Sequence, residues 1–262
     1  VEILSLYSKE NNLFFNIKET VKIKHGCLDT NSNKFKLVKC LRDLLEKNDA
    51  DIIITTHGFI SNAVLINKKY LKNKNIIVTE HVDYYDSSKK RRIIRAILYK
   101  RANKVIVLTN KSKELYERYL NNVEVIANPL SFSTDKTSNQ KNKKIIAVGR
   151  LEEVKRFNLL IEIFKNISNL HKEWILDIVG DGSQKEYLQY LINKNNLEER
   201  VKIKPFTKNI MNEYLNASIY ALTSEFEGFS LVLTEAKECG LPCISFDLPG
   251  PAEIIKHNED GL

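Results

Sequence analysis

Two cations stand close together in the segment IIAVGRLEEVKRF, in the second half of the chain. Arg150 directly follows a strand-like run, and Lys155 comes five residues later, where a helical pattern begins. Cations that meet a helix N-terminus can hold a diphosphate, because side-chain charge, backbone N–H groups and the helix dipole all favour an anion there. Two solvated surface cations fit the same spacing. The pair therefore indicates an anion site only in combination with other residues.

Two glutamates mark the segment SEFEGFSLVLTEAKECGLPCI. Glu227 and Glu235 are separated by seven residues, with Gly228 at a turn and a helix expected from about Ser230. Glu227 is expected in the loop at a strand end, and Glu235 about one and a half turns into the helix. Backbone N–H groups of Phe229–Val232 would be uncapped donors able to hold an anion. A simpler explanation is also possible, in which the helix dipole favours the first glutamate and the second is an exposed helical residue. This explanation accounts for either glutamate singly, but it leaves the turn and the cation pair as coincidences.

A histidine follows a strand-like run in the first half of the chain. His81, in TEHVDYY, comes just after Ile76–Thr79, at the carboxyl end of a strand, where parallel sheets bind ligands. A histidine there can hydrogen-bond a sugar or relay a proton, although a lone histidine is often structural. His57, in ITTHGFI, occupies a similar position and ranks second.

The excess positive charge lies entirely in the first half of the chain. Residues 1–140 hold 25 Lys and Arg against 15 Asp and Glu, whereas residues 141–262 hold 16 against 18. The segment SKKRRIIRAILYKRANK holds eight cations and no acid, with Ile93, Ile94, Ile97 and Leu98 along one stripe. Such a helix can lie on anionic lipid or meet a diphosphate-lipid acceptor. It can also pack on a sheet with its basic face in water. No nucleic-acid partner is expected, because no aromatic platform or recognition motif accompanies the charge.

Composition bounds the class of protein. The 262 residues are 43% hydrophobic and 28% charged, which is typical of one large or two medium globular domains and excludes collagen and low-complexity disorder. No run approaches the ~18 apolar residues of a membrane span. The cysteines have no C-x-x-C spacing, so we expect free thiols in a reducing cytoplasm and no zinc; they are Cys27, Cys40, Cys239 and Cys243. We expect a cytoplasmic protein that is at most peripheral on the inner face of the membrane.

Strand-like and helical patterns alternate along the chain, which predicts parallel, doubly wound sheets. The predicted strands are residues 1–7, 51–55, 76–79, 104–109, 123–126, 145–148, 174–179, 201–204, 219–222 and 242–246, and the predicted helices are 34–47, 88–102, 157–170, 184–193, 209–216 and 230–239. The polar stretch SFSTDKTSNQKNKK reads as a linker over residues 131–144. It would separate a domain of residues 1–130 from one of residues 145–262.

Three segments resemble a known family. VGRLEEVKRF, LDIVGDGSQKEYL and ALTSEFEGFSLVLTEAKECGLPCISFDLPGPAEII are similar in order and spacing to the family-four retaining glycosyltransferases of GT-B fold, the glycosyl transferases group 1. The resemblance covers nearly all of residues 51–262, and the E-x7-E element in its EGF context is specific. It implies two Rossmann-like domains facing a cleft, the first binding the acceptor and the second a nucleoside-diphosphate sugar. The family's first strand and glycine-rich loop would precede Val1, and its last helices would follow Leu262, so we expect a segment of a longer protein.

Carried over residue by residue, the resemblance implies a role for each candidate. Arg150 and Lys155 would grip the donor diphosphate, and Glu235 would hydrogen-bond the ribose. Glu227 and His81 would act as catalytic residues at the donor sugar. The other donor-binding residues implied are Gly149, Gly228, Phe229, Ser230 and Leu231 near the phosphates, and Phe206 with the turn Gly180-Asp181-Gly182 and Lys204-Pro205 near the base.

These observations predict a hexosyltransferase. It would move a hexose from a nucleoside-diphosphate donor, expected to be a UDP-sugar, to a bacterial surface-glycan or lipid-linked oligosaccharide acceptor, with retention of configuration as the resemblance implies. Residues 141–262 contain no D-x-D, so we expect side-chain cations to neutralise the leaving group, with no metal and no cofactor besides the co-substrate. Two alternatives are a nucleotide-sugar epimerase of the same fold and a non-catalytic nucleotide-sugar-binding partner subunit. The intact set of candidate residues counts against the second alternative.

Overall fold

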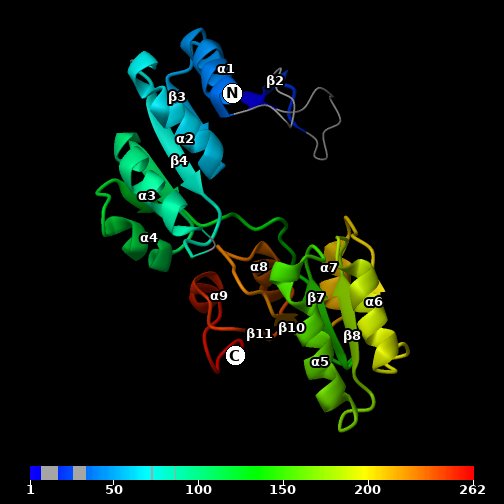
Figure 1. The fold of residues 1–262 in the computed structure, drawn as a ribbon. Coiled ribbons are helices and arrows are strands. Elements are labelled where there is room, and N and C mark those ends of the chain that lie inside the picture. Colours follow the sequence, from blue (N-terminus) through cyan, green and yellow to red (C-terminus); the bar gives the residue numbers. More distant parts are fainter. Residues whose placement is uncertain (7–16, 26–33, 72, 86) are drawn as a thin grey trace.

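The structure, a computed structural model, describes residues 1–6, 17–25, 34–71, 73–85 and 87–262. Within these ranges every sheet is parallel, and helices connect successive strands of the two larger sheets, so the predicted α/β class is confirmed. Two lobes follow one another along the chain (Figure 1). The predicted strand end at Tyr7 and the thiol of Cys27 lie outside the described residues.

The first lobe is built on a four-stranded sheet in the order β3-β4-β5-β6. Its strands are β3 (Ile52–Thr55), β4 (Asn75–Glu80), β5 (Lys104–Val107) and β6 (Val123–Val125). The helices are α1 (Lys34–Glu46), α2 (Gly58–Ile66), α3 (Lys89–Leu98) and α4 (Asn110–Glu117), with 3-10 turns η1 (Lys68–Tyr70) and η2 (Tyr99–Arg101). A separate pair, β1 (Glu2–Ser5) and β2 (Lys22–His25), is also parallel.

The second lobe is built on a five-stranded sheet in the order β11-β10-β7-β8-β9. Its strands are β7 (Lys144–Val148), β8 (Ile175–Val179), β9 (Val201–Lys204), β10 (Ile219–Leu222) and β11 (Cys243–Ser245). The helices are η3 (Glu153–Lys155), α5 (Phe157–Ser168), α6 (Lys185–Lys194), α7 (Ile210–Leu215), α8 (Leu231–Glu238) and α9 (Pro249–Ile254). From β7 the chain moves outward through β8 and β9 and then returns to β10 on the other side. The order therefore reverses between β7 and β10, and such a switch point opens a crevice at the carboxyl ends of the strands.

The strands of both lobes pack through apolar residues, which are buried alternately in some strands and continuously in others. In β4, Ile76 and Val78 are fully buried while Ile77 between them is only partly buried, which is the pattern of a strand with one well-covered face. In β8, Leu176 and Ile178 are buried together with the residues between and after them, because helices cover both faces of this interior strand. The loops at the carboxyl ends thus rest on rigid strands.

The predicted strands and helices within the described residues are confirmed to within two residues at each end, with one exception. The helix predicted over residues 88–102 ends at Leu98, four residues early, and the 3-10 turn η2 follows it. One strand and three α-helices of the described residues were missed, β2, α2, α4 and α9, together with the 3-10 turns η1 and η3. The predicted linker contains no helix or strand up to residue 143, but it packs on the second lobe. The Ser138 amide donates to the Cys239 carbonyl at 2.8 Å, and the Thr134 amide donates to Glu238 Oε1 at 2.9 Å.

Helix α3 corrects one alternative of the sequence analysis. Had the helix simply packed its apolar stripe on the sheet, the isoleucines would be buried. Instead Ile93, Ile94 and Ile97 are 60%, 45% and 61% exposed, and Arg95 is buried. The sheet-packing alternative is therefore wrong for these three side chains, because Arg95 and Tyr99 occupy the inward face.

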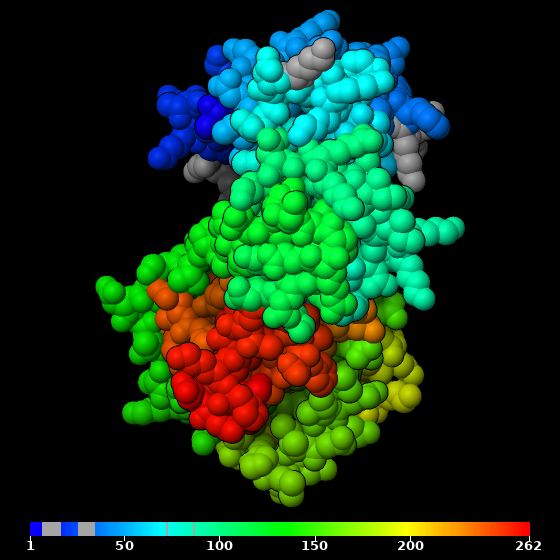
Figure 2. Space-filling model, turned by 90° about the vertical axis from the view of Figure 1, so that its left-hand side faces the viewer, coloured from blue at the N-terminus to red at the C-terminus, as the bar shows by residue number. Residues whose placement is uncertain are grey.

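The lobes meet through α9 and α4. Both oxygens of the Glu253 carboxylate accept hydrogen bonds at the start of α4, from the Asn110 amide at 2.8 Å, the Asn110 side chain at 3.0 Å and the Lys111 amide at 2.7 Å. A carboxylate is favoured there by the unpaired N–H groups and the helix dipole. Figure 2 shows the green segment that contains α4 directly above the red C-terminal segment.

Two further expectations concern thiols and membrane spans. Cys40, Cys239 and Cys243 are free thiols, as predicted. Among the described helices, none has both the length and the apolar character that crossing a bilayer requires.

Candidate functional site

The loops that follow β7 and β10 come together at the switch point of the second sheet. A backbone hydrogen bond joins them, from the Glu225 amide to the Val154 carbonyl at 2.8 Å, and Thr223 Oγ1 donates to the Lys155 carbonyl at 3.0 Å. Each loop carries candidates that the sequence placed at strand ends. The fold therefore brings together residues 72 positions apart in the chain.

An ion pair forms the centre of this arrangement. Lys155 Nζ lies 2.5 Å from Glu227 Oε1, and the two side chains are only 17% and 11% exposed. Ser224 Oγ donates to the same carboxylate oxygen at 2.9 Å. The sequence predicted both residues as neighbours of one ligand but not their direct contact. Because the pair is mostly shielded from water, each charge is held in place and strongly felt by any ion that enters.

The N-terminus of α8 is open beside the pair. Ser230, at the N-cap position, has a left-handed backbone (φ 77°) and makes no side-chain cap to the helix. Its hydroxyl is buried and has no hydrogen-bond partner among the described residues. A helix start without a cap leaves N–H donors unsatisfied. The uncapped helix start expected from the sequence is thus present, with Phe229 packed against Gly250 on one side and Leu231 partly exposed.

Glu235 lies in the buried part of α8. Its side chain is 8% exposed, and Glu235 Oε2 accepts a hydrogen bond from the Tyr214 hydroxyl at 3.0 Å. Burial raises the pKa of Tyr214 well above its ordinary value, so the hydroxyl keeps its proton and donates. The simpler explanation, an exposed helical glutamate, is wrong. Tyr214 was missed, since one tyrosine in an amphipathic helix looks like any core residue.

Gly149 and Arg150 lie on a tightly packed turn after β7. A Cβ on Gly180 would lie 1.9 Å from the Gly149 carbonyl oxygen, and one on Gly182 would lie 2.6 Å from the Leu151 carbonyl oxygen. Only glycine allows this close approach of two backbones. The turn presents Arg150 at the surface, where its side chain makes no hydrogen bond or ion pair with other described residues.

The region predicted near the base is held by Asp181. Its carboxylate accepts a hydrogen bond from the Phe206 amide at 2.9 Å and pairs with Lys185 Nζ at 3.1 Å. The Phe206 amide, more than Lys185, lowers the pKa of this carboxyl group. Phe206 itself is exposed. Lys204 is engaged elsewhere, because its Nζ pairs with the buried Asp177 at 2.9 Å.

His81 approaches the same loop from the first lobe. It follows β4, is exposed, and its Nε2 lies 3.1 Å from Thr79 Oγ1. A Cβ on Gly228 would lie 2.5 Å from the His81 carbonyl oxygen. The histidine segment and the EGF turn are therefore in contact across the two lobes. His57, ranked second, is the exposed N-cap residue of α2.

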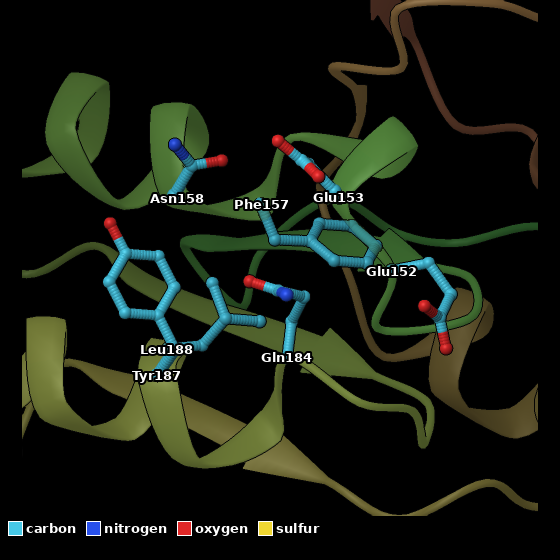
Figure 3. A pocket seen from close by; sticks show the side chains of 7 residues that line it. All are labelled: Glu152, Glu153, Phe157, Asn158, Gln184, Tyr187 and Leu188. Atoms are coloured by element: carbon cyan, nitrogen blue, oxygen red, sulfur yellow. The ribbon is translucent and has the colours of Figure 1, made fainter.

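A cavity in the second lobe lies away from these residues. It has a volume of about 320 Å³ and lies between the starts of α5 and α6, where Glu153, Asn158 and Tyr187 face it (Figure 3). None of its seven lining residues is a predicted donor-binding residue. Its lining is mainly uncharged and acidic, which does not suit a diphosphate. The candidate site is consequently the group of residues at the switch point and not this cavity.

The described residues contain no group of three or more His, Cys, Asp or Glu side chains that could hold a metal ion. The chain does contain one D-x-D, Asp49-Ala50-Asp51. It precedes β3 and so lies at the amino end of that strand. The candidate site lies at carboxyl ends, so this motif is not part of it.

Comparison with known proteins gives the family. Residues 131–262 match the family model "Glycosyl transferases group 1", and residues 5–133 match "Glycosyltransferase Family 4". The amylovoran biosynthesis glycosyltransferase AmsD of Erwinia amylovora is 36% identical over 239 residues, 87% of this chain and 67% of that protein. A Campylobacter jejuni α-1,4-N-acetyl-D-galactosaminyltransferase that acts on a diNAcBac-PP-undecaprenol glycan is 26% identical over 276 residues, covering 100% of this chain and 75% of that protein.

The solved structures agree on the fold. Anabaena Alr3699/HepE, solved with UDP and glucose, superposes with a TM-score of 0.77 at 20% identity, covering 92% of this chain and 72% of that one. Two larger solved chains superpose with TM-scores of 0.74 and 0.70, and this chain spans 47% of each. The chain belongs to the family-four glycosyltransferases, the glycosyl transferases group 1, and has the GT-B fold.

Proposed function

We propose that this protein transfers a hexose from a UDP-sugar to a bacterial surface-glycan or lipid-linked oligosaccharide acceptor, with retention of configuration. The observation that carries the proposal is the shielded Lys155–Glu227 pair beside the open N-terminus of α8, at the switch point of the second sheet. A cation, a set of free N–H groups and a carboxylate are the groups that a diphosphate joined to a sugar requires.

Each residue has a distinct task in the proposed reaction. Lys155 and Arg150 hold the diphosphate and neutralise the charge that grows on it as the bond to the sugar breaks. The N–H groups at the start of α8 bind the same oxygens. Glu235, oriented by Tyr214, accepts hydrogen bonds from the ribose hydroxyls.

The bond changes take place on one face of the sugar. The acceptor hydroxyl oxygen bonds to the anomeric carbon on the face from which UDP departs. The carbon–oxygen bond to the diphosphate breaks, and the leaving phosphate oxygen takes the acceptor proton. Glu227 and His81 orient the sugar and stabilise positive charge on it; the backbone of His81 contacts Gly228, the residue after Glu227. No metal is needed in this scheme, since side-chain cations face the leaving group.

The relatives support the acceptor class. One acts in amylovoran biosynthesis, and another adds an α-linked sugar to a glycan carried on undecaprenyl diphosphate. A UDP complex of the superposed HepE supports the donor nucleotide. We place this protein with its acceptors, in the cytoplasm and at the inner face of the membrane.

The test is a donor panel with the full-length protein. UDP- and GDP-sugars are supplied with lipid-linked glycan acceptor extracted from the source cells, and nucleotide release is followed. Acceptor-dependent release from one UDP-hexose, with the donor's anomeric configuration kept in the product by NMR, is expected. Acceptor-independent conversion of the sugar would instead indicate the epimerase. Donor binding without any release would indicate the non-catalytic partner.

A further inference from the structure

Helix α3 presents an apolar stripe to solvent. Ile93, Ile94 and Ile97 lie on one side of the helix, and all three are at least 45% exposed. The helix lies on the surface of the first lobe (Figure 1), and side chains of its segment, coloured between cyan and green, project outward in Figure 2. Single exposed isoleucines need no explanation, but three adjacent ones on one helix do.

A buried ion pair fixes this orientation. Arg95 points inward, where its Nη1 lies 3.5 Å from Glu80 Oε2 and donates to Ser87 Oγ at 2.8 Å. The Tyr99 hydroxyl donates to the other oxygen of Glu80. Burial raises the pKa of Glu80, because a charged carboxylate is unfavourable away from water. The positive charge of Arg95 acts in the opposite direction and stabilises the ionised carboxylate. Rotating the helix to hide the isoleucines would leave that carboxylate buried and unpaired.

Cations surround the stripe. Lys89, Lys90 and Arg91 precede it and Lys100 and Arg101 follow it; all five side chains are exposed and none forms an ion pair with the described acids. Lys68 Nζ donates to the Arg101 carbonyl at 2.5 Å, so η1 lies next to η2 and adds its lysines to the rim. The stripe and these cations form what we call the α3 face.

We propose that the α3 face docks the protein on an anionic lipid bilayer, with α3 lying in the plane of the interface. The isoleucines would enter the boundary between headgroups and acyl chains while the cations meet lipid phosphates. Pairing with a second copy is disfavoured, because it would press two acid-free cationic rims together. This inference goes beyond the proposed transfer reaction, since lipid binding needs neither donor nor acceptor.

The test is co-sedimentation of the full-length protein with vesicles. One set is phosphatidylcholine alone, and the other contains about 30% phosphatidylglycerol. We expect binding to the second set only, weakening as salt rises. Lys89→Glu/Lys90→Glu should weaken it at least ~20-fold, at about fivefold for each basic residue near the surface. Ile93→Ser/Ile97→Ser should weaken it at least ~10-fold.

Matched variants on the second lobe serve as controls. Ile163→Ser/Ile167→Ser changes two isoleucines that are also exposed, and Lys141→Glu/Lys172→Glu changes two exposed lysines. Both should bind vesicles like wild type. UDP affinity of every variant should be unchanged, which separates this inference from the transfer reaction. Three results would each overturn the proposal. The first is equal binding of the wild type to both vesicle sets, and the second is an equal loss of binding in the α3 variants and the control variants. The third is a protein that does not bind lipid but self-associates, with the self-association abolished by Ile93→Ser/Ile97→Ser.

Discussion

Replacing Lys155 by alanine tests the proposed diphosphate site most sharply. Its ammonium is mostly shielded from water and lies 2.5 Å from Glu227 Oε1. A charge-assisted hydrogen bond in such a setting contributes about 1.5–3 kcal/mol. Each 1.4 kcal/mol is about tenfold in affinity, so Lys155→Ala should weaken UDP binding about 10- to 100-fold.

The neighbouring carboxylate sharpens the expectation. Glu227 competes with the diphosphate for Lys155 in the free protein. Glu227→Gln should therefore leave UDP affinity equal or slightly higher, whereas Lys155→Ala leaves an unpaired carboxylate that repels the diphosphate. The double variant should bind UDP better than Lys155→Ala alone. This pattern is a thermodynamic coupling between two residues in contact.

Isothermal titration calorimetry of the full-length variants with UDP measures all of these affinities. Lys165→Ala, on the exposed side of α5, is the matched control and should bind like wild type. Unchanged affinity in Lys155→Ala would refute the reasoning. So would a loss of affinity in Glu227→Gln as large as that in Lys155→Ala.

Two further predictions concern Glu235 and Asp181. Glu235→Gln should cost about 1–2 kcal/mol of UDP affinity and abolish the preference for UDP over 2′-deoxy-UDP; calorimetry that finds the wild-type preference intact would contradict it. The pKa of Asp181 is lowered in the folded protein, so its carboxylate stabilises the fold above its ordinary pKa of 3.8, and this contribution is lost as pH falls through the lower folded value. Asp181→Asn should melt slightly below wild type at pH 7, with the gap closing below about pH 4; a gap that is constant with pH in calorimetric melts would refute this.

Sequence patterns located most of the site because its residues follow strand ends. Glu227 and Lys155 could be placed beside the carboxyl ends of parallel strands by counting residues from β10 and β7. Their direct contact could not be predicted, since it depends on the strand order β10-β7, which periodicity does not contain. The missed helix α4, NKSKELYE, is too polar to show an apolar face.

Contacts between distant segments account for the rest. The exposed isoleucines of α3 follow from Arg95 pairing with Glu80 at the end of β4, and no local pattern shows that a helix will bury its arginine. Glu253 joins the start of α4 from more than 140 residues away. Such pairs are properties of the assembled fold, and a single sequence carries no sign of them.

The most direct test of the central proposal is sugar transfer measured in excess EDTA, with wild-type protein and Glu227→Gln side by side. Nucleotide release from the preferred UDP-hexose should continue for wild type without metal. In Glu227→Gln it should fall at least ~100-fold, as when a transition-state contact is removed, with UDP affinity retained. Loss of wild-type activity that Mn²⁺ restores, or near-wild-type transfer by Glu227→Gln, would contradict the account.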